Sequence, residues 1–236
     1  MIWRYFMLSD YELMELQVNV LFNHDEFGGM TWINEPGTKS APRIFLGITN
    51  QGTVERYHQA LHEDVKDELK RIVAKSPWVD APNRVNLAEI ISVLSKDRPI
   101  ENVYAGPAYV FPELRGASTH AVRITHENIG LLEHHFPDYF DDVKNGQPMF
   151  AVVQNQVAVS LCCSARQTSD AAEASLHTAQ NFRGKGYALE VCTAWAAEVQ
   201  SQGRIALYST AWNNLSSQAV ARKLRLKQYG VDLHFS

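Results

Sequence analysis

The feature that most limits the fold is a series of three strand-like runs with no helical pattern between them. The runs at 149–153 and 157–163 are apolar and joined by the short polar turn Gln154-Asn155-Gln156, and a third run follows at 172–178. This layout predicts a β-hairpin and then a third antiparallel strand. Such a succession argues against a parallel sheet of the Rossmann or Walker type, in which strands alternate with helices.

A turn with two glycines follows the third run and opens a long helical pattern. Its sequence is Gln180-Asn181-Phe182-Arg183-Gly184-Lys185-Gly186-Tyr187-Ala188. Glycines let the backbone approach a ligand closely, and the N–H groups and dipole at the start of a helix favour anions. The turn therefore has the chemistry of a phosphate site, although the chain has no Gly-Lys-Ser/Thr sequence of a Walker loop.

The segments after this turn predict an alternating helix and strand order. Apolar residues at i, i+4, i+7 and i+11 over 188–199 predict a helix that Gly203 terminates. A strand is expected at 204–209, then a helix from the N-cap Asn214 to Leu224, and a last strand at 229–235.

The sequence patterns in the first half of the chain predict further helices and strands but indicate no function. Ser9 and Glu12 form a candidate capping box at the start of a helix. The other expected elements are a strand at 43–49, helices over 61–73 and 86–94, two strand pieces at 102–111 around a kink at Gly106-Pro107, a linker at 112–118, a strand at 120–124, a helix at 127–136 and a polar loop at 166–170.

Composition is that of an ordinary globular protein. The 236 residues carry a formal net charge of -4, which gives no reason to expect nucleic acid or an anionic membrane as a partner. No apolar run has the roughly 20 residues that a membrane span needs. Of the three cysteines, Cys162 and Cys163 are adjacent and Cys192 stands apart, a pattern that suits reduced thiols and a cytoplasmic protein. Adjacent strand residues also point to opposite faces of a sheet, so the vicinal pair is not expected to act as a nucleophile.

Histidines at metal-ligand spacing occur once. His58 and His62 stand four apart on the helix expected over 61–73, but no third ligand is placed by any pattern and the His-Glu-x-x-His order is missing. We therefore expect a solvated helix face there and no metal.

From about residue 118 to the end, the sequence resembles the GNAT superfamily of N-acetyltransferases. The family pattern Arg/Gln-x-x-Gly-x-Gly/Ala is met by residues 183–188, and Asn214 with Ser217 meets a second pattern in the helix after the next strand. The resemblance implies an α/β (α+β) fold with a mixed, largely antiparallel sheet flanked by helices. We expect this domain at 118–236 and an N-terminal α/β domain at 1–112, whose role as a degenerate copy or a substrate lid stays open.

The resemblance also implies how acetyl-CoA would bind. In this family the pyrophosphate lies on the turn, the pantetheine arm fits between the strands before the turn and after its helix, and a backbone N–H, here near Leu176 or His177, contacts the thioester oxygen. The cofactor contacts implied in this way are Leu176, His177, Thr178, Arg183, Gly184, Lys185, Gly186, Tyr187, Ala188, Asn214 and Ser217.

The catalytic groups follow the family less closely. Glu173 lies ten positions before Arg183, where many members place a catalytic carboxylate, and His177 is a second candidate base. Each has a structural alternative, an exposed or ion-paired carboxylate and a histidine packed at the strand end. Many members carry a tyrosine seven residues after the Asn as the general acid, whereas this chain has Ala221. Ser217, Tyr208 or a water could replace it, or the reaction needs no acid, because a thiolate leaves readily.

A second departure concerns the end of the same helix. Family members tend to end it in Gly-Phe, where this chain has Arg225-Leu226.

The leading hypothesis is direct attack of a primary amine, on a small molecule or a protein, on acetyl-CoA in a ternary complex. The alternative is a catalytically weak GNAT-like module that binds acyl-CoA as a sensor or interaction domain. A third reading, generic nucleotide binding through the turn, predicts that ATP competes with CoA. A homodimer is left open.

Overall fold

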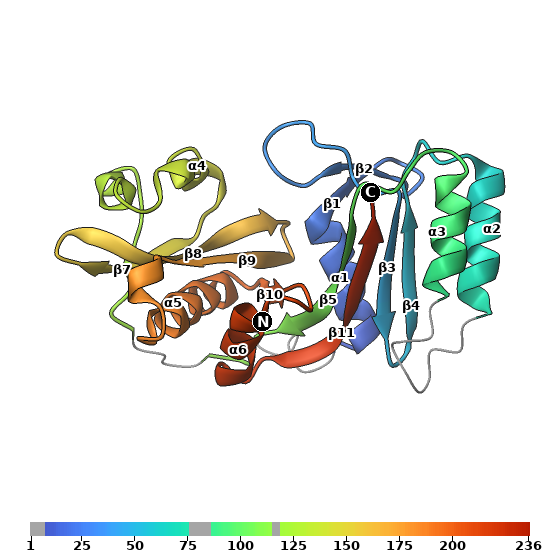
Figure 1. Ribbon diagram of the computed structural model, residues 1–236. Helices are drawn as coiled ribbons and strands as arrows, with labels where there is room; N and C mark the ends of the chain where they lie inside the picture. The colour runs from blue at the N-terminus through green and yellow to red at the C-terminus, as the bar shows by residue number, and fades with distance from the viewer. Residues whose placement is uncertain (1–7, 76–85, 115–118) are drawn as a thin grey trace. The chain divides into compact units, whose positions relative to one another are not determined.

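The computed structural model describes residues 8–75, 86–114 and 119–236, which form two compact units (Figure 1). Of the described residues, the first unit contains those from 8 to 108 together with 210–213 and 228–236, and the second contains those of 109–209 and 214–227. The C-terminal strand thus completes the first unit. The expected linker lies partly outside the described residues. Its described part is held by Gln200, which accepts from the N–H of Leu114 (2.9 Å) and donates to the carbonyl of Pro112 (2.8 Å).

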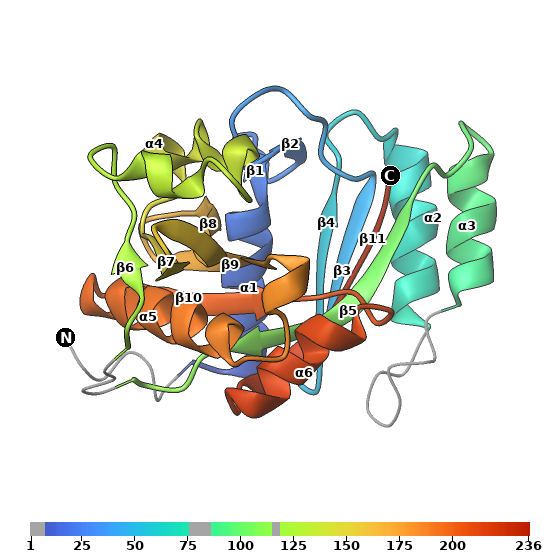
Figure 2. The same cartoon turned by 60° about the vertical axis from the view of Figure 1, so that its left-hand side comes forward.

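The first unit is a sheet with helices on both faces. Its strands run in the order β4-β3-β11-β5, and β3 pairs antiparallel with both β4 and β11. Helix α1 covers one face, while α2 and α3 lie side by side on the other (Figures 1 and 2). The elements are α1 (Asp10–Leu21), β1 (Phe22–His24), β2 (Met30–Ile33), β3 (Ile44–Thr49), β4 (Gly52–Tyr57), α2 (Glu63–Ala74), α3 (Leu87–Ser95), β5 (Val103–Val110) and β11 (Lys227–Phe235).

The capping box predicted at the start of the first helix is confirmed, because Ser9 and Glu12 form it reciprocally on α1. The helix expected at 86–94 is α3, and Asn86 caps it by accepting from the N–H of Glu89. Both are interactions between residues three apart, so the sequence contains all the information that they need.

Two other predictions are wrong. Residues 103–110 form one continuous strand, because Gly106 permits close backbone contact instead of a kink. A Cβ atom there would lie 1.8 Å from the carbonyl oxygen of Thr210. His58 is not on α2 either; it forms a β-bridge with Met30, and only His62 reaches the helix, as its N-cap.

The second unit has five strands in the order β10-β9-β8-β7-β6, antiparallel except for the parallel pair β9–β10. Asn155 and Gln156 both have positive φ, which is the backbone geometry of a tight hairpin turn, and they join β7 to β8. The elements are β6 (Val122–Arg123), η2 (Ile129–Leu132), η3 (Pro137–Tyr139), α4 (Asp142–Asn145), β7 (Met149–Gln154), β8 (Val157–Gln167), β9 (Ala171–Thr178), η4 (Gln180–Phe182), α5 (Tyr187–Ser201), β10 (Ile205–Ser209) and α6 (Leu215–Lys223).

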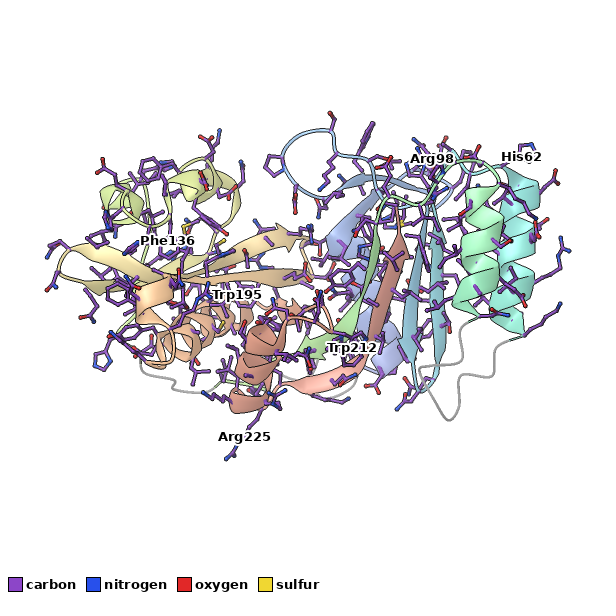
Figure 3. The ribbon with its side chains drawn as sticks, in the orientation of Figure 1. His62, Arg98, Phe136, Trp195, Trp212 and Arg225 are labelled. Atoms are coloured by element: carbon purple, nitrogen blue, oxygen red, sulfur yellow. The ribbon has the colours of Figure 1, made fainter. Side chains whose placement is uncertain are left out.

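Separate apolar clusters lie on the two faces of this sheet. Helix α5 packs on one face through Trp195, and η2, η3 and α4 cover the other with Phe136 (Figure 3). Cys162 belongs to the first cluster and Cys163 to the second, as strand alternation predicts. All three cysteines are buried and free.

Three segment predictions need correction in this unit. The helix expected at 127–136 is a short 3-10 turn, because Asn128 uses its side chain on the preceding loop and Gly130 disfavours a longer helix. The strand expected at 120–124 is reduced to β6. The loop expected from residue 166 begins later, because β8 continues to Gln167.

The predicted fold class is confirmed: the sheets are mixed, largely antiparallel and flanked by helices. Among the described residues, no helix combines the length and apolar character that crossing a bilayer requires.

Candidate functional site

The glycine turn is left-handed at two positions and open in front of both. Gly184 has φ of 78° and Gly186, the N-cap of α5, has φ of 88°. A Cβ atom built on either glycine would meet nothing within 4 Å. Their glycine identity is therefore required by backbone conformation, and it leaves free space beside the first turn of the helix.

Side chains hold this turn against the end of β9 and leave its N–H groups available. Arg183 Nε donates to the carbonyl of Thr178 (3.2 Å), and Lys185 Nζ lies 4.9 Å from the centre of the Phe182 ring. Within the described parts of the chain, no group accepts a hydrogen bond from the N–H of Gly184, Lys185 or Gly186. Donors of this kind at a helix start form an anion site.

The strands before and after α5 are paired over only part of their length. The parallel register runs from Ile205–Ala171 to Leu207–Glu173, while β9 continues to Thr178. On its other edge β9 stays paired with β8 as far as Thr178–Ser160. The strands β9 and β10 therefore split after Glu173, and the β10-facing backbone of the rest of β9 is outside this ladder.

Glu173 stands at the point where the strands separate. It is only 4% exposed, although the sequence left an exposed carboxylate open. Its Oε2 pairs with Nη1 of Arg166 on β8 (3.1 Å), and its Oε1 accepts from Oγ of Ser209 on β10 (2.5 Å). A β-bulge between Ser164 and Arg166 brings the arginine opposite Glu173. The carboxylate thus links three strands.

Two further polar residues follow on the same face of β9. Ser175 Oγ lies 3.2 Å from Nε2 of His177 and 3.5 Å from Oη of Tyr139, whose ring centre is 5.2 Å from that of His177. Burial raises the pKa of Tyr139 to about 12 and lowers the pKa of His177 from its ordinary value. Near neutral pH the tyrosine hydroxyl therefore keeps its proton and the imidazole is uncharged.

Helix α6 carries the second sequence pattern. Asn214 caps it by accepting from the N–H of Ser217 (3.1 Å), as predicted. Ser217 Oγ lies 2.5 Å from Oη of Tyr208 on β10, and burial raises the pKa of that tyrosine above its ordinary value. Ala221 is fully buried in the cluster around α5, so the position where the family places tyrosine carries only a packing contact.

The end of α6 has a left-handed residue, Arg225, at the position where family members tend to have glycine. Arg225 has φ of 54°, its N–H donates to the carbonyl of Arg222, and the N–H of Leu226 donates to that of Ala221. These two bonds define the helix end that usually has glycine at this position.

The predicted residues therefore fall into groups on both faces of the sheet. The turn follows directly from β9, whereas Glu173 lies on the face opposite α5 and Ser217 contacts Tyr208 on the α5 face. The structure does not bring the side chains of Glu173 and Ser217 together on one face. The functional candidates that the sequence analysis missed are Arg166, Ser209, Ser175 and Tyr139. The sequence contained one usable signal, the alternation of Glu173, Ser175 and His177 along a strand.

Comparison with known proteins agrees with this geometry. The family model described as GNAT acetyltransferase matches residues 23–229. No curated protein matches the chain. Among solved structures, a GNAT-family protein from Novosphingobium aromaticivorans is 12% identical over 58% of this chain and 65% of its own, with a TM-score of 0.50.

Two other solved structures match almost the whole chain at lower TM-scores. A GNAT-family acetyltransferase from Colwellia psychrerythraea is 14% identical over 98% of both chains, with a TM-score of 0.49. A GCN5-related N-acetyltransferase-like protein from Streptococcus suis is 14% identical over 97% of this chain and 100% of its own, with a TM-score of 0.46.

The family match and the mixed, helix-flanked sheet define the class as that of the GNAT acetyltransferases. The chain belongs to the GNAT acetyltransferase family. The family match begins at residue 23, so it extends well beyond the segment from about 118 on which the sequence resemblance rests.

Proposed function

We propose that this protein is an N-acetyltransferase that moves the acetyl group of acetyl-CoA to a primary amine within a ternary complex. The observation that carries the proposal is the open, left-handed turn Gly184–Gly186 beside the split between β9 and β10. The turn offers donors for a pyrophosphate, and the split exposes strand backbone to an extended arm. Membership of the GNAT acetyltransferase family supports both assignments.

In this proposal the cofactor contacts come mainly from backbone. The pyrophosphate lies on residues 183–188, and the arm follows β9 at Leu176, His177 and Thr178. A backbone N–H of Leu176 or His177 stabilises the negative charge that develops on the thioester oxygen. Asn214 and Ser217 belong to the cofactor side through the first turn of α6.

The proton transfers need two groups. Glu173 and His177 are the candidates on β9 to take the proton of the incoming ammonium. On the α5 face, the Tyr208–Ser217 pair is the candidate to protonate the departing thiolate, because the buried phenol keeps its proton near neutral pH. We expect a cytoplasmic enzyme without a metal, and the three free cysteines support the compartment.

Two measurements test the proposal together. Acetyl-CoA should raise the unfolding temperature, because a ligand that binds only the native state stabilises it. ATP at the same concentration should have a smaller effect, since it lacks the pantetheine arm. Addition of a panel of amines should then release free CoA thiol at a rate that depends on the amine. If acetyl-CoA does not stabilise the protein, the cofactor assignment is wrong.

The second candidate function is an acyl-CoA-binding module without turnover. It is favoured by one observation, the buried Ala221 at the family's tyrosine position. Stabilisation by acetyl-CoA without thiol release from any amine in the panel would support this module and contradict the enzyme.

A further inference from the structure

The surroundings of Glu173 are those of a structural clamp. Each carboxylate oxygen already accepts a hydrogen bond from a neighbouring strand, one from Arg166 and one from Ser209. The side chain is enclosed, and the position is the last one at which β9 and β10 are paired. A group placed here fixes where the strands part, but a proton that it accepted would have no direct exchange with solvent.

His177 lies four residues further along the same face of β9 and has the opposite character. The residue keeps one side open to solvent, so its ring can pass a proton to water, although its other side is covered and burial lowers its pKa. The ring is also held on one side, because its Nε2 lies beside Ser175 Oγ and the Tyr139 ring contacts it at a tilt of 57°. A base needs this combination of a fixed ring and a route to solvent.

We infer that His177 accepts the proton of the acceptor ammonium, that Ser175 and Tyr139 position its ring, and that Glu173 positions the split between β9 and β10. This inference rests on the proposed function. It gives Glu173 and His177 separate roles, although both are candidates for the same general base in the proposed function.

The proton balance of the reaction is complete with these groups. The neutral imidazole of His177 takes one proton from the ammonium and becomes imidazolium. The free amine attacks the thioester carbon, a C–N bond forms and the C–S bond breaks. The departing sulfur takes a proton from Tyr208 and leaves as CoA thiol, and the second amine proton passes to water, from which the tyrosine regains its own. The imidazolium returns the first proton to water.

The groups around His177 determine the expected pH dependence. Tyr139 approaches it from η3, with Asp138 and Asp142 close to that tyrosine, and Cys163 lies beneath Ser175 on β8. Burial raises the pKa of Cys163 to about 12, so the thiol, like Tyr139, is neutral near pH 7. Because burial lowers the pKa of His177, the base is available at neutral pH and activity falls on the acid side as the ring becomes protonated.

Steady-state kinetics across pH separate the two roles. His177→Gln should lower kcat by about 10²-fold or more, with little change in KM for acetyl-CoA. It should also remove the acid limb, which is the fall of kcat at acid pH. Imidazole should partly rescue His177→Ala. Glu173→Gln should keep the acid limb and mainly raise KM for acetyl-CoA. The matched control is His120→Gln, whose side chain is 98% exposed and which should behave as wild type.

Two results would overturn the inference. One is an unchanged kcat and acid limb in His177→Gln, and the other is loss of the acid limb in Glu173→Gln with its retention in His177→Gln.

A second measurement does not depend on turnover. NMR titration of the histidine rings should show that the pKa of His177 rises toward about 6.5 in Tyr139→Ala, because the ring loses the cover that desolvates it. Ser175→Ala should change the tautomer signal of the same ring. A His177 titration unaffected by both variants refutes the positioning roles. If no amine releases thiol from the wild-type protein, the proposed function fails, but this titration still decides whether Ser175 and Tyr139 hold the ring.

Discussion

The two glycines of the turn permit a test that separates folding from cofactor binding. Gly184→Ala and Gly186→Ala each place a methyl group on a left-handed backbone, in space that is empty in the protein alone. Gly203 is the matched control, because it has φ of 78° but lies beyond the other end of α5. All three substitutions therefore carry the same kind of conformational cost, and only two of them stand at the turn.

The expected magnitudes follow from this geometry. An L-residue in the left-handed region costs about 1–2 kcal/mol. In a chain of this size each kcal/mol lowers the unfolding temperature by about 2–4 °C. At the turn the methyl group would also enter the empty space that the proposed function assigns to the pyrophosphate. Loss of one hydrogen bond to a charged group costs about 1.5–3 kcal/mol, which weakens Kd for CoA by roughly tenfold to a hundredfold.

Calorimetric titration with CoA and urea unfolding measure the two effects independently. We expect Gly203→Ala to lose stability and keep its affinity, and Gly184→Ala and Gly186→Ala to lose both. Wild-type affinity in both turn variants would refute the reasoning, and so would an equal loss of affinity in Gly203→Ala.

Three smaller predictions concern single side chains. Tyr208→Phe should slow thiol release and leave acetyl-CoA affinity unchanged, since only the hydroxyl beside Ser217 is removed; an unchanged kcat would exclude it as the acid. Arg225→Gly should raise the free energy of unfolding in urea by about 0.5–1 kcal/mol, because glycine adopts the left-handed conformation without strain; a loss of stability would contradict this. Burial, with a contribution from Arg56, lowers the native pKa of His24. The unfolded chain therefore binds more protons below about pH 6.5, so the free energy of unfolding decreases as the pH is lowered through that range. His24→Gln should reduce this dependence on pH.

Features with a local cause could be predicted from the sequence. The capping box at Ser9, the N-cap at Asn214 and the hairpin turn at 154–156 each depend on residues within three positions of one another. The same holds for the turn at 183–188, whose two glycines mark the start of the helix α5. Local patterns of this kind also carried the family resemblance.

Features that depend on distant partners could not be predicted in this way. Gly106 looked like a kink, but its partner is the backbone of Thr210, more than a hundred positions away. Tyr139 follows a segment that the periodicity assigned to an α-helix, so its position over β9 was hidden. Nothing near Glu173 in sequence indicates that Arg166 and Ser209 would enclose it, because a bulge in β8 and the parallel strand β10 bring them there.

The strand β9 shows why one short segment can serve several functions at once. Its backbone lies next to the split that we assign to the cofactor. Alternate side chains, Ala174 and Leu176 among them, pack toward α5, while Ser175 and His177 point to the opposite face, which also carries the apolar cluster of Phe136. Substitutions at the polar positions should therefore change the proton transfer that we propose without disturbing the α5 core. Substitutions at the apolar positions alter the packing that holds the backbone for the cofactor, so they should affect cofactor affinity and stability together.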